Sequence, residues 1–482
     1  MGIRTGREFI ESLRDGRAVY VNGGRVADVT DYASFRGIVA TLAALYDFQH
    51  EHPAELTYRS PLSGNPVAAG FLMAKTIEEV KFRSRAELMR ADFNYGLMGR
   101  MPDFCNAFVT DLACGPEDLG VRDKRLGENM VSYYEECREG DLCLTHTLID
   151  PQVDRSRGPA EQSDPFLTMR PVRESDRGVI VRGAKMLSTL APFANELIVG
   201  PFMPRKPGEE DYAISFAIPC NTPGLKFVCR EPYDDGRHGD FDRPLTSHYD
   251  EQDALAIFED VLVPWERMFI YRDIEIYNTI MMRRLGFTQL QACIRGLAKL
   301  KFLTGLACQI AETIGRTEAI HVRAQLGELV ANVELLKGLV RNGATEVADA
   351  RAAGVPPLAI SATLWVFIPK AHMQVAQAIR ELSGSGIILT PTEADFDNPD
   401  IAHHLDKYLQ GKGVPARDRV RLFKLAWDMV GSQFGSRQHQ YEWFYAGDPY
   451  FTRNRFYGLP VVKEYKDIVA RLLERGGLAK KG

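Results

Sequence analysis

The spacing of apolar residues changes twice along this chain, and the change restricts the folds it can adopt. Over about residues 1–145, apolar residues recur at helical spacing, as in DYASFRGIVATLAALYDFQHEHP. From about 146 to 271, short β-branched and aromatic runs take over, and in DYAISFAIP (211–219) every second residue is large and apolar. Such alternation is typical of a half-buried strand. Helical spacing then returns for the rest of the chain.

This order predicts an α+β protein with an N-terminal helical domain (1–145), a β-barrel domain (146–271) and a C-terminal helical bundle with its tail (272–482). Spacing alone leaves open whether the middle segment is an antiparallel sheet or a closed barrel. The β segment is inserted between helical parts, without repeat, linker or low-complexity tract. We therefore expect one integrated subunit.

The overall composition excludes several classes of protein. A net charge of −5 argues against general affinity for nucleic acid or anionic membranes. No apolar run approaches the roughly 18 residues that suggest a transmembrane helix, and the charged N-terminus does not resemble a signal peptide. The eight cysteines form no CxxC pair and no zinc spacing, so we expect reduced thiols, no metal site and a cytoplasmic location.

The usual cofactor-binding motifs are also missing. The stretch SGSGII has two glycines but lacks the third glycine of a dinucleotide-binding turn. No phosphate-binding loop, HExxH or GxSxG motif occurs. If the protein uses a redox cofactor, it must therefore hold it with a fold other than the Rossmann type.

Four stretches carry the strongest functional signal: GLMGRMPDFCNAF (96–108), LTHTLIDPQVDR (144–155), GAKMLSTLAPFANELIV (183–199) and SRQHQYEWFYAGDP (436–449). In this order and spacing they resemble the flavin-dependent 4-hydroxyphenylacetate 3-monooxygenase family, the oxygenase components of two-component phenol hydroxylases. The resemblance covers essentially the whole chain. It implies an acyl-CoA-dehydrogenase-like fold, with flavin between barrel and helices, and a homotetramer.

The resemblance also implies a reaction. Such an oxygenase receives reduced FAD (FADH2) from a separate NAD(P)H:flavin reductase. O2 adds to the flavin to give a 4a-hydroperoxide, which hydroxylates a phenolic or other electron-rich aromatic substrate. The protein then has to supply position, hydrogen bonds and exclusion of water.

His146 raises the sharpest question among the single residues, because a lone histidine is more often structural than catalytic. In the family motif, the matching histidine lies by the flavin and hydrogen-bonds the substrate hydroxyl. An imidazole suits this task because it can donate or accept a proton near neutral pH. Arg100 matches an arginine that would stabilise a phenolate, and Thr189 a threonine that faces the flavin ring. The structural alternatives are a capped strand end, a surface arginine and a strand threonine.

The resemblance implies a larger set of flavin contacts: His146, Thr147, Leu148, Gln152, Val153, Asp154, Arg155, Thr189, Ala446, Gly447 and Asp448. In 152–155, the alternative is an ordinary capped turn with a surface ion pair between Asp154 and Arg155. AGDP, likewise, can be a turn without a ligand.

Two departures from the family pattern affect the expected substrate. Phe104 stands where the hydroxyphenylacetate enzymes have a tyrosine, and it cannot hydrogen-bond a substrate hydroxyl. Leu290 stands where chlorophenol and nitrophenol members have a base histidine. We therefore expect a more apolar pocket that accepts either a bulkier aromatic substrate or one that lacks the usual phenol contact. The substrate-binding set is Arg100, Phe104, His146, Leu290, Phe202 and Met203.

Two other functions remain open at this point. The departures would permit a family member that binds flavin or an aromatic ligand without turnover. A 4-hydroxybutyryl-CoA dehydratase would need three cysteines and a histidine around an iron–sulfur cluster. This chain has Gly99, Asp103, Leu290 and Leu297 near those positions.

Overall fold

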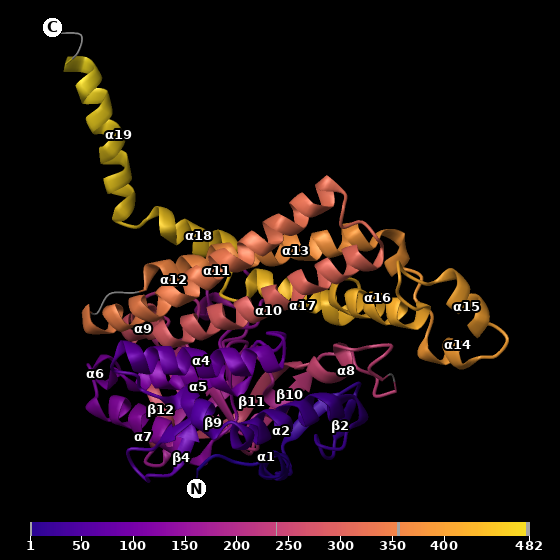
Figure 1. Ribbon diagram of the computed structural model, residues 1–482. Helices are drawn as coiled ribbons and strands as arrows, with labels where there is room; N and C mark the ends of the chain where they lie inside the picture. Colours follow the sequence, from indigo (N-terminus) through magenta and orange to yellow (C-terminus); the bar gives the residue numbers. More distant parts are fainter. Residues whose placement is uncertain (1, 238, 354–356, 479–482) are drawn as a thin grey trace.

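The computed structural model of the protein describes residues 2–237, 239–353 and 357–478. In Figure 1, the N-terminal helices and the strands occupy the lower half of the molecule, and the long C-terminal helices lie across them. The predicted α+β class is thus confirmed. The N-terminal helices are α1 (Gly6–Ser12), α2 (Arg36–Glu51), α3 (Pro53–Leu56), α4 (Ile77–Phe93), α5 (Pro102–Ala113), α6 (Pro116–Leu119) and α7 (Lys124–Gly140).

The main sheet has six strands in the order β2-β1-β10-β11-β7-β6. Its two longest strands, β7 and β11, are antiparallel neighbours of 12 residues each. The alternation that predicted strands is visible in β11, whose buried residues are mostly every second one. The strands are β1 (Ala18–Val21), β2 (Gly24–Val26), β6 (Arg170–Ser175), β7 (Gly178–Thr189), β10 (Leu225–Cys229) and β11 (Asp253–Pro264).

A second sheet of four strands has the order β12-β9-β8-β5. Within it, β5 runs parallel to β8, and His146 lies opposite Ile198. An isolated bridge between Ile149 and Met186 connects the chain after β5 to β7 of the first sheet. The strands are β5 (Leu144–Thr147), β8 (Glu196–Val199), β9 (Ile214–Pro219) and β12 (Met268–Tyr271), while β3 (Thr57–Arg59) and β4 (Pro66–Ala68) form a separate pair.

The first 145 residues, predicted as a helical domain, also contain strands. Strands β1 and β2 form a hairpin that joins the main sheet through β10. The hairpin turn is Asn22–Gly23, with φ values of 51° and 79°. Asn-Gly is a strong local signal for such a two-residue turn. The predicted domain boundaries at 145/146 and 271/272 remain predictions.

The C-terminal part is built around α10, most of whose residues are buried. It packs against α4 and α5 from the N-terminal part and against α11 and α13. One large apolar core runs through helices and sheets alike, as expected for an integrated subunit, beside a small cluster around Leu56, Ala69 and Ala86. The main helices are α9 (Ile274–Arg284), α10 (Gly286–Thr313), α11 (Ile320–Ala353), α13 (Ile368–Ser383), α16 (Ala416–Val430), α17 (Gln433–Phe444), α18 (Pro449–Tyr457) and α19 (Val461–Leu478).

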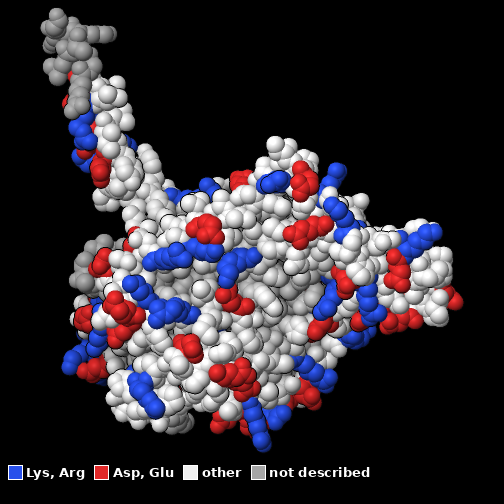
Figure 2. Space-filling view, viewed as in Figure 1, with Lys and Arg blue, Asp and Glu red and all other residues white. Residues whose placement is uncertain are grey.

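The outer surface carries charges of both signs. Figure 2 shows acidic and basic side chains interspersed over one face of the molecule. In the described part of the chain, no helix combines the length and the apolar character needed to cross a membrane. Helix α19 extends away from the body of the protein (Figure 1).

Candidate active site

Two predicted site residues, Arg100 and Phe104, lie where α5 begins. Arg100 is only 9% exposed, which rules out the surface arginine considered from the sequence. Its guanidinium carbon lies 4.4 Å from the centre of the Phe104 ring. Its backbone N–H donates a 2.7 Å hydrogen bond to Glu251 Oε1. The start of α5 therefore presents a buried cation against an aromatic ring.

His146 lies on β5 and faces the same place. Its ring centre is 5.6 Å from that of Phe104 and 5.8 Å from that of Phe108. Its Nδ1 is buried and has no hydrogen-bond partner among the described residues. Burial, together with the nearby Arg100, holds the pKa of His146 well below its usual range. The imidazole is therefore neutral around pH 7 and can donate or accept one hydrogen bond.

Two tyrosines of α17 and its end complete this cluster, and neither was singled out from the sequence. The Tyr445 ring lies 5.9 Å from Phe104, and the Arg100 guanidinium lies 5.0 Å from Tyr445 and 5.6 Å from Tyr441. Both tyrosine hydroxyls are buried without a partner within the described ranges. Their spacing of four residues, which places them on one helix face, was the available signal.

A buried ion network connects the cluster to the main sheet. Arg437 of α17 donates to Asp253 Oδ1 at 2.8 Å and to Glu251 Oε2 at 3.1 Å. Glu251 is the same carboxylate that accepts the backbone N–H of Arg100. The Thr189 hydroxyl donates to Asp253 Oδ1 at 2.6 Å. Because this hydrogen bond uses the hydroxyl proton, Thr189 can only accept a hydrogen bond from a ligand.

The network keeps the carboxylate of Asp253 in its charged form. Burial alone would raise the pKa of Asp253, but Arg437 and Arg230 outweigh it and hold that pKa well below the usual range. Arg230 donates to Asp253 Oδ2 at 3.0 Å. The network thus keeps a fixed negative charge between two guanidinium groups at neutral pH.

The residues after His146 divide into a buried and an exposed part. The Thr147 hydroxyl donates to the Met186 carbonyl at 3.3 Å, and the Leu148 carbonyl accepts from Lys185 Nζ at 3.3 Å. Asp150 then bonds both Lys185 and Arg205, each at 2.6 Å. These contacts hold the end of β5 against β7.

The predicted flavin turn 152–155 lies mostly in solvent. Gln152, Val153 and Arg155 are exposed, and Asp154 is half-buried. Asp154 pairs with Arg157 at 3.3 Å, so the surface ion pair considered as the structural alternative is present, with Arg157 in place of Arg155. Neighbouring side chains of an extended turn diverge, whereas a residue three positions on can fold back.

The segment Ala446-Gly447-Asp448 follows α17 and meets another predicted loop. Gly447 has a φ of +110°, which favours glycine, and a Cβ there would lie 3.4 Å from Phe202 Cζ. Asp448 caps α18 by accepting from the Tyr450 N–H at 2.8 Å. Met203, next to Phe202, is 49% exposed. Two loops predicted to take part in binding are thus brought together.

Leu290 lies in a different environment. It is 1% exposed on α10, and a Cβ on Gly343 of α11 would lie 3.0 Å from its Cδ1. Leu290 therefore packs among the helices, and its assignment to the substrate pocket stays a prediction.

Across the described ranges, no group of three or more His, Cys, Asp or Glu side chains could hold a metal ion.

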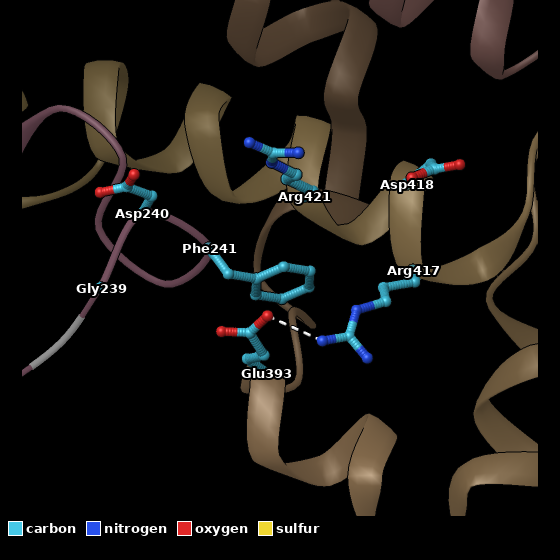
Figure 3. Close-up of a pocket in the computed structure, with 7 residues that line it drawn as sticks. All are labelled: Gly239, Asp240, Phe241, Glu393, Arg417, Asp418 and Arg421. Atoms are coloured by element: carbon cyan, nitrogen blue, oxygen red, sulfur yellow. Dashed lines mark hydrogen bonds and ion pairs between the residues drawn. The ribbon is translucent and has the colours of Figure 1, made fainter.

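An open pocket of about 500 Å³ lies elsewhere, between the loop at Phe241 and two C-terminal helices, α14 (Glu393–Asp397) and α16. Figure 3 shows the Arg417–Glu393 ion pair, 2.7 Å long, along its wall. None of the predicted site residues lines this pocket. We therefore take the Arg100 cluster as the candidate site.

Comparison with known families matches almost the whole chain. The 4-hydroxyphenylacetate 3-hydroxylase N terminal family model matches residues 5–270, and the corresponding C terminal model matches residues 281–474. The 4-hydroxyphenylacetate 3-monooxygenase oxygenase component of Thermus thermophilus is 37% identical over 98% of this chain and 97% of its own length. The Geobacillus sp. protein of the same name is 36% identical over the same shares.

Solved structures agree. The oxygenase component of 4-hydroxyphenylacetate 3-monooxygenase, complexed with FAD and 4-hydroxyphenylacetate, superposes with a TM-score of 0.92 at 36% identity over 99% of both chains. An acyl-CoA dehydrogenase from Geobacillus kaustophilus has a TM-score of 0.54 at 16% identity, over 93% of this chain and 95% of its own. This second likeness concerns the fold alone and confirms the predicted acyl-CoA-dehydrogenase-like architecture.

The ion network predicts a large effect of Asp253→Asn on stability. The amide keeps the shape of the side chain but removes the charge that Arg437 and Arg230 share, so that each keeps only its second partner, Glu251 or Asp250. Breaking one partner of a buried pair costs about 3–5 kcal/mol, so the free energy of unfolding should fall by this order. Denaturant unfolding followed by circular dichroism measures it.

Asp260→Asn provides the matched control. Asp260 lies on the same strand and pairs with Arg182 at 2.7 Å, but both side chains are about half exposed. Exposed pairs contribute about 0–1 kcal/mol, so this variant should unfold nearly like the wild type. Equal losses in the two variants would contradict the importance assigned to the buried network.

Proposed function

The chain belongs to the 4-hydroxyphenylacetate 3-hydroxylase family, and on that premise we propose that it hydroxylates a phenolic substrate in the cluster of Arg100, Phe104 and His146. It is the oxygenase component of a two-component flavin monooxygenase. One observation carries the choice of site. Arg100 and His146 come from distant motifs, yet they converge on Phe104 with an unpartnered imidazole nitrogen between buried rings.

FAD, with O2 as co-substrate, is the cofactor, and the residues present fit it. Gly447 has no Cβ, so a ligand can approach its backbone beside Phe202. The turn 152–155 is mostly exposed to solvent. The Thr189 hydroxyl oxygen can still accept a hydrogen bond. We assign Thr147, Leu148, Ala446 and Asp448 to the same binding surface because they flank these contacts. Reduced FAD, when bound, would supply the two electrons with which one oxygen atom of O2 is added to the aromatic ring and the other leaves as water.

The side chains of the cluster suit a phenol. Arg100 is a permanent cation that would stabilise a phenolate, the electron-rich form of the ring. His146 is neutral, so its Nδ1 can accept the hydroxyl proton or hold it in a hydrogen bond. Phe104 and Phe108 exclude water from this position, which strengthens both interactions.

An oxygenase component requires a separate NAD(P)H:flavin reductase, and the substrate is a small aromatic molecule.

We further propose a homotetramer. Helix α19 exposes Tyr465, Ile468 and Leu472 by 51–70%, an apolar face that a subunit interface would cover. None of the eight cysteines, all of which lie in the described ranges, forms a disulfide, which supports a cytoplasmic location.

The first expected result is dependence on a reductase. The purified protein with NADH and oxidised FAD should form no hydroxylated product, because the chain has no nicotinamide-binding motif. Adding a flavin reductase should start product formation from a panel of phenols, followed by mass spectrometry. Strong NADH oxidation by this chain alone would contradict the two-component assignment.

His146→Ala should reduce product formation at least ~10²-fold, the range for a lost proton donor or acceptor. The same assay with saturating reductase measures the effect, and circular dichroism checks folding. His248→Ala serves as the control, since His248 is 40% exposed and pairs with Asp240. If His146→Ala retains normal coupled turnover, His146 is only a structural residue.

Phe104→Tyr should shift substrate preference. The wild-type pocket is apolar at this position, so it should favour bulkier aromatics over 4-hydroxyphenylacetate, with discrimination of only ~1–3 kcal/mol. The new hydroxyl would lie near Arg100 and His146 and should favour simple 4-substituted phenols. The measurement is the product ratio for 4-hydroxyphenylacetate against a bulky phenol. An unchanged ratio means that Phe104 does not set specificity.

A further inference from the structure

Tyr445 carries a polar group that the described contacts leave unused. It directly follows α17, and its ring is partly buried while its hydroxyl oxygen is fully buried. Within residues 2–237, 239–353 and 357–478, that hydroxyl has no hydrogen-bond partner. Buried hydroxyls are normally paired, and an unpaired one is costly. A buried, unpaired donor beside a candidate site indicates that a ligand completes it.

The ring of Tyr445 is held between two cations. The guanidinium of Arg100 lies 5.0 Å from the ring centre, and that of Arg295 lies 4.7 Å from it. Arg295 of α10 is 1% exposed and binds Glu442 with both terminal nitrogens, at 2.6 and 2.9 Å. Lys299 adds a third bond to Glu442 at 2.8 Å. Because Glu442 lies one turn before Tyr445, this ion cluster fixes the ring in place.

The ring of Tyr445 lies beside the candidate substrate position. Tyr445 contacts Phe104 edge to face, with 5.9 Å between ring centres, and Phe104 in turn contacts His146. Phe104 itself has no polar atom. Three described polar side chains lie against this ring and could bind a substrate oxygen: Arg100, His146 and Tyr445.

We propose that Tyr445 positions the substrate by donating a hydrogen bond to the phenolic oxygen that Arg100 and His146 also contact. This inference rests on the proposed function, because it places a phenol in the cluster. Burial raises the pKa of Tyr445 to about 12, so the hydroxyl is protonated at neutral pH and acts as a donor. A donor to a charged oxygen forms a stronger bond than one between neutral groups.

Tyr441 does not fit this role equally well. Its ring lies 4.4 Å from the Arg437 guanidinium, within the ion network. Its hydroxyl occupies the space beside Gly99, where a Cβ would lie 2.2 Å away. Tyr441 thus fills the gap that Gly99 leaves, whereas Tyr445 lies against Phe104.

Binding of 4-nitrophenol to the FAD-loaded protein tests the proposal. Only the phenolate form of this probe absorbs strongly in the visible range, so one titration reports both its affinity and its ionisation. Tyr445→Phe keeps the ring but removes the donor. The dissociation constant should rise at least about tenfold. The bound phenolate fraction at a given pH should fall, because its oxygen loses a stabilising hydrogen bond.

Tyr133→Phe provides the matched control, because it also removes a buried tyrosine hydroxyl. Tyr133 lies on α7, where its ring packs against Phe269 and beneath the Arg267 guanidinium. This variant should bind 4-nitrophenol like the wild type, with the same phenolate fraction. A general loss of packing would affect both variants, whereas the proposed contact affects only Tyr445→Phe.

Several outcomes overturn the proposal. They are an unchanged affinity and phenolate fraction in Tyr445→Phe, equal changes in the Tyr133→Phe control, or a wild type that does not bind the probe. Failure of the proposed function looks different. In that case, 4-nitrophenol binds in a Tyr445-dependent way, but the protein with reductase, FAD and O2 forms no hydroxylated product from any phenol.

Discussion

The site depends on the buried contact of Asp253 with Arg437. Asp253 begins β11, Arg437 lies on α17, and the two meet although 184 positions separate them. Around them, Glu251 accepts a hydrogen bond from the backbone N–H of Arg100, and Thr189 at the end of β7 donates one to Asp253. Charges buried in a protein are tolerated only when paired, so each partner fixes the others. The sheet, the start of α5 and the C-terminal helix are thereby locked in one arrangement.

This arrangement decides the protonation state of the site. Arg100 and burial both act on His146 and favour its neutral form, while Arg100 itself remains charged. A neutral imidazole and a fixed cation, next to each other, can bind a phenolic oxygen without adding a second positive charge. Aromatic rings on either side exclude water, which strengthens these interactions. The electrostatics of the site therefore follow from its packing.

The two departures from the family pattern have different structural surroundings. Phe104 lies in the centre of the cluster, in contact with Arg100, His146 and Tyr445. Leu290 packs near Gly343 between long helices. A change at position 104 alters the polarity of this cluster directly. From position 290, any influence on a substrate has to pass through the packing of α10 and α11.

Apolar spacing by itself predicted the order of helices and strands, because spacing reports which face of an element is buried. Motif resemblance indicated Arg100, Phe104 and His146 and the family's chemistry. Local patterns do not show which distant segments meet, so Tyr445 was overlooked. Only the tertiary structure decided that Tyr441 of α17 and Tyr445 lie against Arg100 and that Thr189 donates its proton to Asp253. The physical reason is that buried polar groups take partners by proximity in space, which depends on the packing of the whole chain.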